Sequence, residues 1–187
     1  MSASKVKNYN VCVFCGSKLG NNKKFIYVAN KLGEELSKKN YTIIYGGGTL
    51  GLMGALAKGV LKDNGKLISI IPSSLKNNNI LSTKPFKTIY TKDFIERKKL
   101  MIKKASIFIV LPGGFGTLDE LFEVISLNQL KVINKKIILI DVDNFWNPLQ
   151  KLLKVIYKEG FLYNLKNSNI IFKKSVNKTI KFIEQNI

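Results

Sequence analysis

The stretch SIFIVLPGGFGTLDELFE, residues 106–123, contains three structural signals in succession. Residues 106–111 are mostly apolar, as expected of a strand that is buried on both faces of a sheet. The glycines of PGGFGT then allow a tight turn, and beyond them apolar residues recur with helical spacing. We therefore predict a strand, a glycine-rich turn and a helix at 117–130, which together form the repeating unit of a parallel α/β sheet.

The same alternation of strand and helix extends along almost the whole chain. Strands are predicted at residues 9–14, 41–45, 66–71, 86–90, 106–111, 136–142 and 169–172. Helices are predicted at residues 22–39, 50–62, 93–104, 117–130, 146–158 and 174–185. This order predicts an α/β fold with a doubly wound, mostly parallel sheet of about seven strands and helices on both faces.

Length and composition fit a single domain over residues 1–187, because 187 residues that are 45% hydrophobic can bury a substantial core. We expect residues 1–8 to be a flexible N-terminus and the polar stretch 73–85 to be a flap over a site. No apolar run approaches the ~20 residues needed to cross a bilayer, and the N-terminus lacks the pattern of a signal peptide. We therefore expect a cytoplasmic protein with no membrane partner.

The chain carries a formal net charge of +19, but its thirty lysines are scattered rather than gathered into a basic patch. We expect no specific nucleic-acid partner, although a lysine-rich nucleic-acid protein stays an alternative. Histidine is absent, which removes the commonest general acid or base and the commonest metal ligand. Cys12 and Cys15 are expected to be reduced structural thiols on opposite faces of a strand, and we expect no metal and no cofactor.

A first glycine-rich turn is expected at the carboxyl edge of the sheet, where parallel α/β folds bind ligands. Gly46, Gly48 and Gly51 match the G-x-G-x-x-G pattern of dinucleotide sites. No acidic residue follows the next strand to bind a ribose, so the match is incomplete. The alternative is that these glycines only permit a tight turn and close packing of a helix.

A second glycine-rich turn, PGGFGT at 112–117, precedes another helix whose N-terminal N–H groups can bind an anion. Thr117 is the expected cap of that helix. No Gly-Lys-Ser/Thr sequence follows, so we do not expect hydrolysis of a nucleoside triphosphate. Two such turns without an acidic ribose ligand favour a mononucleotide or a sugar phosphate over a dinucleotide.

The helix after PGGFGT carries two acids, Glu120 and Glu123. Its predicted core-facing stripe consists of Leu118, Leu121, Phe122 and Ile125. The two acids are expected to project roughly opposite that stripe, a position typical of a solvated acidic face. Glu120 nevertheless lies one turn beyond the expected anion site, where the sugar of a bound nucleotide would fall.

Arg97 is the single arginine in a chain that otherwise uses lysine. Helical spacing places Phe94, Arg97 and Met101 on one face, so Arg97 is expected on the apolar side of its helix. A buried cation needs an anionic partner, and the planar guanidinium suits a carboxylate or a phosphate better than an ammonium does. The alternative is a purely structural ion pair between this arginine and a glutamate.

Four motifs together resemble the LOG (Lonely Guy) family, the cytokinin riboside 5′-monophosphate phosphoribohydrolases, which has also been labelled "possible lysine decarboxylase". The motifs are CGS at 15–17, YGGGTLGLMG at 45–54, ERKKLM at 96–101 and PGGFGTLDELFE at 112–123. The resemblance implies a Rossmann-like fold and a homodimer with the site near the subunit interface. It also implies hydrolysis of the N-glycosidic bond of an adenine-type nucleoside 5′-monophosphate, AMP or N6-modified AMP, to free base and ribose 5-phosphate.

Matching positions imply roles for individual residues. Arg97 and Glu120 match the catalytic pair of the family. The residues expected to bind substrate are Ser17, Gly47, Gly48, Lys98, Gly113, Gly114, Phe115, Gly116, Thr117 and Glu123. A pyridoxal-dependent decarboxylase is not expected, because nothing singles out one lysine for a Schiff base.

The chain departs from the family pattern in two places. Phe94 and Ile95 stand where the family often has Met-His, and Asp119 stands where it has glutamate. The first change bears on the base pocket or on partner contacts, and so on the substrate more than on the reaction. A protein that binds or senses a nucleotide or phosphate ligand without catalysis is the alternative to the enzyme.

Overall fold

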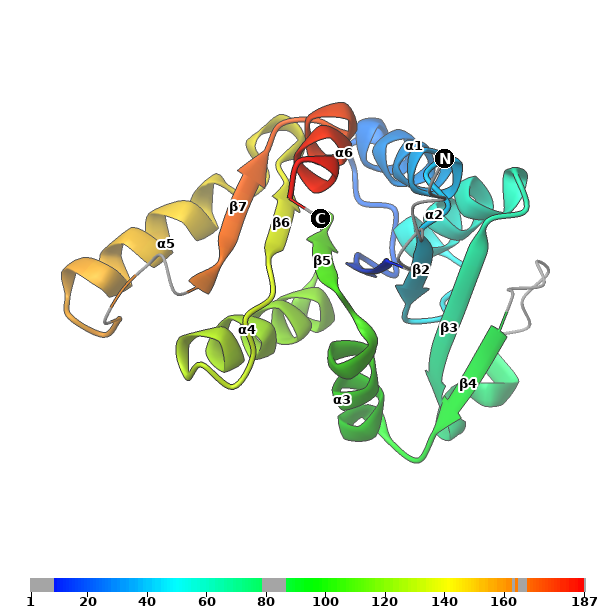
Figure 1. Ribbon diagram of the computed structural model, residues 1–187, viewed down its shortest axis with the longest axis horizontal. Helices are drawn as coiled ribbons and strands as arrows, with labels where there is room; N and C mark the ends of the chain where they lie inside the picture. Colours follow the sequence, from blue (N-terminus) through cyan, green and yellow to red (C-terminus); the bar gives the residue numbers. More distant parts are fainter. Residues whose placement is uncertain (1–8, 79–86, 163, 165–167, 187) are drawn as a thin grey trace, which may run out of the picture.

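The computed structural model describes residues 9–78, 87–162, 164 and 168–186. In this part of the chain seven strands form one sheet in the order β4-β3-β2-β1-β5-β6-β7, and every neighbouring pair is parallel (Figure 1). The strands are β1 (Asn10–Phe14), β2 (Thr42–Tyr45), β3 (Lys66–Pro72), β4 (Lys87–Thr91), β5 (Ile107–Val110), β6 (Ile137–Ile140) and β7 (Ile170–Lys173). The predicted α/β fold is confirmed.

The α-helices of the described residues lie close to the predicted ones. They are α1 (Lys23–Lys38), α2 (Gly51–Lys62), α3 (Phe94–Lys104), α4 (Phe115–Gln129), α5 (Asn147–Lys158) and α6 (Val176–Glu184). Asp93 is the N-cap of α3, and its carboxylate accepts the backbone N–H of Glu96 at 2.8 Å. This cap satisfies a donor that the helix itself cannot pair, and it fixes where the helix starts.

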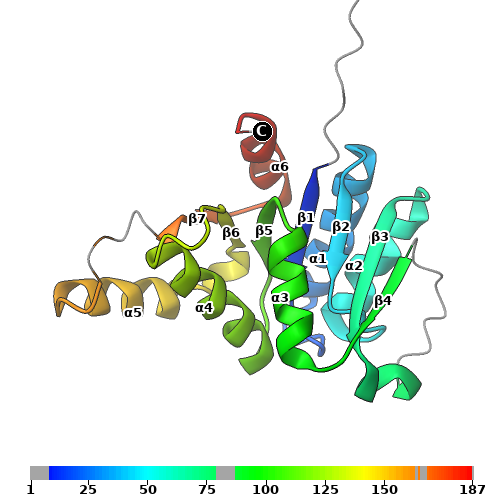
Figure 2. The ribbon, with the colours of Figure 1, turned by 60° about the horizontal axis from the view of Figure 1, so that its bottom comes forward.

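The helices cover the two faces of the sheet in separate layers (Figure 2). One apolar cluster joins the strands to α1, α2 and α6, and the other joins them to α3, α4 and α5. Alternate strand residues supply the two clusters, because successive side chains of a strand point to opposite faces. Cys12 belongs to the α3 side and Cys15 to the α1 side, both as free thiols, so the prediction that they lie on opposite faces is confirmed.

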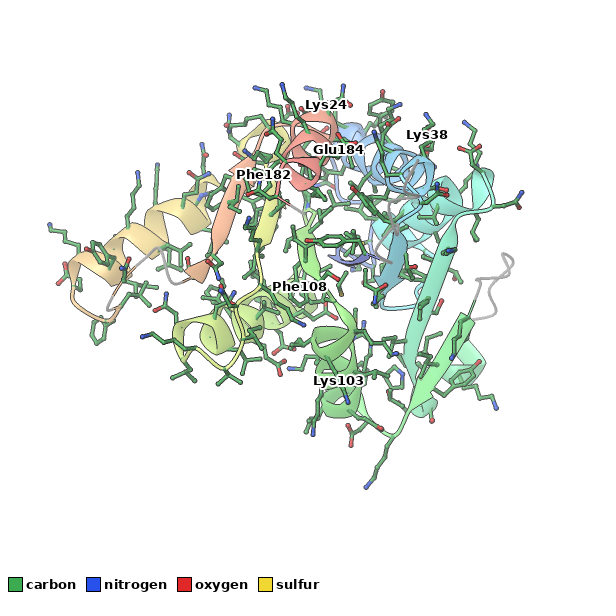
Figure 3. The ribbon with its side chains drawn as sticks, in the orientation of Figure 1. Lys24, Lys38, Lys103, Phe108, Phe182 and Glu184 are labelled. Atoms are coloured by element: carbon green, nitrogen blue, oxygen red, sulfur yellow. The ribbon has the colours of Figure 1, made fainter. Side chains whose placement is uncertain are left out.

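The lysines extend outward from helices of both layers. Figure 3 shows Lys24 and Lys38 leaving α1 and Lys103 leaving α3, whereas Phe108 lies inside, between the sheet and a helix layer. In the part of the chain that the structure describes, no helix is long and apolar enough to cross a membrane.

Part of the stretch expected to be a flap, 73–85, is helical. A short 3-10 helix, η1 (Ser73–Asn78), occupies its beginning. The remaining residues, 79–85, lie outside the described part of the chain, as do residues 1–8, for which we expected flexibility.

The strand predicted at 136–142 ends earlier than expected, at Ile140. A second 3-10 helix, η2 (Val142–Asn144), follows it instead. The chain turns at Asp141, because the carboxylate of this residue accepts the backbone N–H of Trp146 at 2.8 Å and so closes a loop. The side chain of Asp141 is fully buried and also pairs with Lys174 at the end of β7.

The order of the strands creates a crevice beside β1. The chain adds β2, β3 and β4 on one side of β1, then returns to add β5, β6 and β7 on the other. The segments that leave the carboxyl ends of β1 and β5 therefore lead to helices in opposite layers, α1 and α4. Such a divergence is where doubly wound sheets bind their ligands.

Candidate functional site

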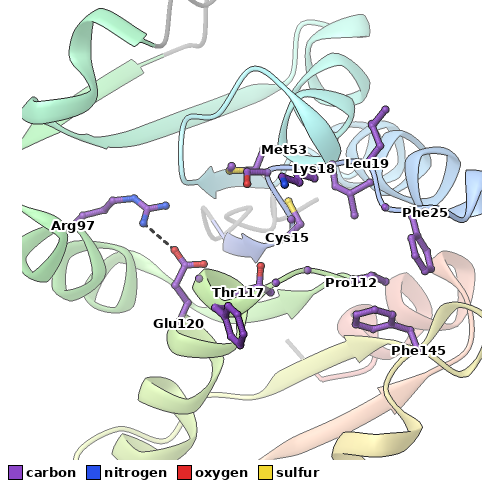
Figure 4. A pocket seen from close by; sticks show the side chains of 18 residues that line it. Cys15, Lys18, Leu19, Phe25, Met53, Arg97, Pro112, Thr117, Glu120 and Phe145 are labelled. Atoms are coloured by element: carbon purple, nitrogen blue, oxygen red, sulfur yellow. Dashed lines mark ion pairs between the residues drawn. The ribbon is translucent and has the colours of Figure 1, made fainter.

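The crevice at the ends of β1 and β5 contains a pocket of about 510 Å³, called the main pocket here. The turn after β1, residues 15–20, lines one side, and the turn after β5 with the start of α4, residues 112–117, lines another. Arg97 from α3 and Glu120 from α4 lie at one end (Figure 4). The structure thus brings together the two residues that the sequence singled out and the whole glycine-rich turn predicted to bind phosphate.

A second pocket of about 380 Å³ adjoins the main pocket and shares Ser17, Met53 and Arg97 with it. The residues that line this second pocket are Ser17, Gly46, Gly48, Thr49, Leu50, Met53, Leu75, Phe94 and Arg97. Its rim is apolar, because Leu50 and Phe94 are 77% and 51% exposed. Phe94 was predicted to lie on the buried face of α3 with Arg97 and Met101; this is wrong for Phe94, although Met101 is buried.

Arg97 is bonded on two sides. Its Nε donates to the carbonyl oxygen of Ile70 in β3 at 3.1 Å, and its Nη1 lies 3.0 Å from Oε1 of Glu120. The side chains of Arg97 and Glu120 are only 13% and 10% exposed. A lysine could not make both contacts with one rigid group, because its ammonium is a compact point charge on a flexible chain. The predicted anionic partner of Arg97 is therefore a carboxylate of the same chain.

Gly46 makes room for this guanidinium. A Cβ atom at Gly46 would lie 2.1 Å from Nη2 of Arg97, closer than any two such atoms can approach. The G-x-G-x-x-G match at 46–51 thus has a structural explanation at its first position. At its last position, Gly51 has a φ of +62° and packs against the backbone of Ser17, which joins this turn to the turn after β1.

Glu120 lies on the buried face of α4, not opposite it as predicted. The buried residues of α4 are Thr117, Glu120, Leu121, Val124, Ile125 and Asn128. Burial raises the pKa of the Glu120 carboxyl above its ordinary value, and the Arg97 guanidinium, which lowers the pKa, offsets only part of that rise. The pair therefore holds a carboxylate in an environment that would otherwise favour its protonated form.

The N-terminus of α4 faces the main pocket without a side-chain cap. Its N-cap residue is Gly114 and the helix begins at Phe115, so the prediction that Thr117 is the cap is wrong. Thr117 is instead buried inside the first turn, where its Oγ1 lies against Gly113. First-turn N–H groups that no side chain caps, together with the positive end of the helix dipole, form a site suited to a phosphate.

The backbone of Gly16 holds the turns around this anion site together. Its N–H donates to the carbonyl oxygen of Pro112 at 3.1 Å, and its own carbonyl accepts the N–H of Leu52 in α2 at 3.0 Å. Ser17 follows directly and lines both pockets. The CGS and PGGFGT motifs, almost a hundred residues apart in sequence, are thus parts of one local structure.

Three residues expected to bind substrate, Gly47, Lys98 and Glu123, do not line either pocket. Lys98 lies between Asp119 and Glu123, with ion pairs of 3.0 and 2.9 Å, and its pKa is raised chiefly by the hydrogen bond to Glu123. This network joins α3 to α4 beside the Arg97–Glu120 pair. Gly47 has a φ of +79° and packs against Ile71.

Several pocket residues were not predicted from the sequence. Cys15 lines the main pocket beside the anion site, and burial raises the pKa of its thiol, so that the thiol stays protonated. Leu19, Phe25 and Phe145 line the end of the main pocket away from Arg97. Leu19 follows the CGS motif closely, which was a usable signal, whereas nothing in the pattern singled out Phe25 or Phe145. Among the described residues, no group of three or more His, Cys, Asp or Glu side chains could hold a metal ion.

Known proteins resemble this chain in fold. The molybdenum cofactor binding protein of Rippkaea orientalis superposes with a TM-score of 0.74 at 20% identity, over 96% of this chain and 98% of that one. The Moco carrier protein of Chlamydomonas reinhardtii has a TM-score of 0.71 at 18% identity, over 96% and 97%. At such identities the likeness establishes the fold alone.

Closer likeness comes from sequence. A family model described as "Possible lysine decarboxylase" matches residues 53–183. The cytokinin riboside 5′-monophosphate phosphoribohydrolase LOG1 of Arabidopsis thaliana is 35% identical, over 93% of this chain and 82% of its own length. LOG3 of the same plant, with the same activity name, is 34% identical over 98% and 86%. The chain therefore belongs to the LOG family, as its four motifs indicated.

Proposed function

We propose that this protein hydrolyses the N-glycosidic bond of adenine-type nucleoside 5′-monophosphates, AMP or N6-modified AMP, to the free base and ribose 5-phosphate. The observation that carries this proposal is the buried Arg97–Glu120 ion pair beside an uncapped helix N-terminus, both in one pocket. Relatives named cytokinin riboside 5′-monophosphate phosphoribohydrolases support the same reaction here.

The substrate's phosphate is placed at the N-terminus of α4, against residues 113–117 and Ser17. The ribose then falls beside Glu120, one helical turn along α4. The base continues past Arg97 toward the second pocket, which adjoins the main pocket at Arg97. Gly48 contacts the base side in this arrangement, because it lines the second pocket only.

The apolar rim of the second pocket bears on the choice of base. Leu50 and Phe94 expose apolar surface there, and Ile95, 76% exposed, stands next to Phe94 where the family often has histidine. An alkyl substituent on N6 of adenine would bury part of this surface, which is favourable because apolar area leaves water. The proposal therefore includes N6-modified AMP beside AMP.

Cleavage of a glycosidic bond passes through a state in which positive charge develops on the sugar. A carboxylate beside the anomeric carbon stabilises that charge and can orient the attacking water, and Glu120 takes this role. Arg97 keeps the carboxylate ionised and fixed in position through its second bond to Ile70. The phosphate site adds binding energy remote from the reacting bond, so unphosphorylated nucleosides should be poor substrates.

We also infer that the protein is a cytoplasmic homodimer. α5 extends beyond the sheet in Figure 1, and its exposed residues include Leu152 and Val155, which are neighbours on the helix surface, and Tyr157, each about half exposed. Exposed apolar surface of this kind marks contact sites, and a second copy would cover it.

Sedimentation velocity should give twice the chain mass for the wild type and a shift toward monomer for Val155→Glu. A monomeric wild type would contradict the dimer.

Substitution of the ion pair tests the catalytic roles. Glu120→Gln should lower kcat/KM for AMP by about 10³-fold or more, because the charge-stabilising group is lost. Arg97→Lys should be almost as severe, since lysine keeps the charge but cannot make both bonds. The activity of each variant is measured by chromatography of the free base released from AMP and from N6-isopentenyl-AMP.

The control is Glu159→Gln, which alters an exposed glutamate at the end of α5 and should leave base release unchanged. Near-normal base release by Glu120→Gln or Arg97→Lys would refute the assigned roles. Thermal stabilisation of the wild type by AMP without any base release would favour a nucleotide sensor instead.

The pKa of Glu120 can be titrated directly. By ¹³C NMR of protein labelled at the glutamate carboxyl carbon, the Glu120 signal, assigned by its loss in Glu120→Gln, should titrate above the ordinary value of about 4.3. Arg97→Met should raise that pKa further, because the guanidinium favours the charged form. Activity depends on the carboxylate, so base release should decline as the pH falls through this raised pKa. A Glu120 that titrates at or below about 4.3, or whose pKa falls in Arg97→Met, would contradict the described electrostatics.

Gly46→Ala tests whether the guanidinium position matters. The φ of Gly46 is not positive, so alanine introduces no backbone strain, and its effect comes from a methyl group 2.1 Å from Nη2 of Arg97. Displacing the guanidinium should lower kcat/KM by about 100-fold. The free energy of unfolding, measured in parallel with urea, should change by a much smaller proportion than kcat/KM does. Unchanged turnover would show that the position of Arg97 is not critical.

A further inference from the structure

The main pocket continues past the anion site to an aromatic end, defined by Leu19, Phe25 and Phe145. Figure 4 shows Arg97 and Glu120 on one side of Thr117, and Phe25 and Phe145 on the opposite side. A mononucleotide placed as proposed above runs from the anion site toward Arg97 and does not reach this end. The reaction therefore does not account for the aromatic end.

The aromatic end is a built wall rather than a chance contact. The rings of Phe25 and Phe145 meet edge to face, with centroids 5.6 Å apart, and Phe145 meets the ring of Trp146 in the same manner at 4.9 Å. Trp146 is buried, whereas Phe145 is 38% exposed. Phe145 thus presents ring surface that the protein itself does not cover, backed by a buried ring.

Polar contacts fix the loop that carries Phe145. The carboxylate of Asp143 accepts hydrogen bonds from the side chains of Asn22, at 2.8 Å, and Lys24, at 3.0 Å, which ties the loop to the start of α1. Asp143 and Asn144 both have positive φ, 49° and 63°, a conformation that Asp and Asn adopt more readily than most residues. These hydrogen bonds hold the loop before Phe145 against the start of α1, an arrangement that favours preorganisation of the ring.

The charges around the aromatic end suit an anionic linker. Lys18 is the cation on the β1 turn that lines the main pocket, next to Leu19. Glu120 is the carboxylate among the residues that line this pocket, and it lies at the opposite end, paired with Arg97. A second phosphate group between the anion site and the aromatic end would thus meet Lys18. The carboxylate of Asp143, on the loop that carries Phe145, is not among the residues that line the pocket and is bonded to Asn22 and Lys24.

We propose that the aromatic end is a second ligand subsite, which binds a purine base joined to the bound nucleotide through a pyrophosphate. The ligand class is a dinucleotide whose first half occupies the proposed substrate site, so this inference rests on the proposed placement of the phosphate. The missing acid after the third strand argues against a conventional ribose contact there. The second nucleoside lies on the other side of β1 and is recognised by stacking, which needs no acid.

Binding of three adenylates tests the subsite. The probes are AMP, ADP and diadenosine diphosphate, titrated by calorimetry into full-length Glu120→Gln so that turnover does not interfere. Diadenosine diphosphate should bind about fivefold or more tightly than ADP, because a base stacked on an aromatic ring adds that much affinity. Adding Phe145→Ala, or Phe25→Leu, should reduce the ratio of the two affinities, diadenosine diphosphate over ADP, to about one.

Two controls keep the test decisive. Phe161→Ala removes an exposed ring beyond α5 and should leave the ratio unchanged. Phe145→Leu keeps the apolar volume but not the ring. If Phe145→Ala proves unstable in thermal unfolding, Phe145→Leu replaces it, and the affinity ratio should still fall.

A ratio near one without the added substitutions would overturn the proposal. So would a Phe145 variant that weakens AMP and diadenosine diphosphate by the same factor, since the mononucleotide itself would then occupy the aromatic end. A stacking-dependent ratio in a protein that releases no base from AMP would support the subsite and refute the proposed hydrolase function.

Discussion

The buried ion pair between Arg97 and Glu120 is the interaction on which the rest of the site depends. Taking two charges out of water is unfavourable, and their attraction often fails to offset it, so stability alone is a weak reason for such a pair. Here Ile70 directs a carbonyl at the guanidinium and Gly46 leaves room for it. Three separate segments thus converge on one side chain, which function explains better than stability does.

The strand order places this pair beside the proposed phosphate site. The chain adds strands first on one side of β1 and then on the other, so the turns after β1 and β5 face each other. Gly16 bonds to Pro112 in the turn after β5 and to Leu52 in α2. The uncapped N-terminus of α4 opens into the space between them. Glu120 follows on the same helix, so in the proposed arrangement a single element sets the distance between the phosphate and the reacting bond. The LOG family motifs correspond to these contacts.

Much of the fold could be predicted because buried strands and amphipathic helices differ in the period of their apolar residues. Arg97 could be singled out because it interrupts a lysine background. The predicted orientation of α4 was wrong because the side that faces the sheet is centred on Glu120, Leu121 and Val124, and Leu118 and Phe122 lie at its edge, half-buried. The partners of Lys98 and the meeting of Phe25 with Phe145 depend on how distant elements dock, and periodicity carries no information about that.

A crystal structure of Glu120→Gln with AMP is the most direct test of the arrangement as a whole. The expected result has the phosphate on the first-turn N–H groups of α4, the anomeric carbon beside residue 120, and the base directed past Arg97 into the second pocket. A phosphate bound elsewhere, or a base stacked against Phe145, would contradict the assignment of Arg97 and Glu120 as the reacting centre.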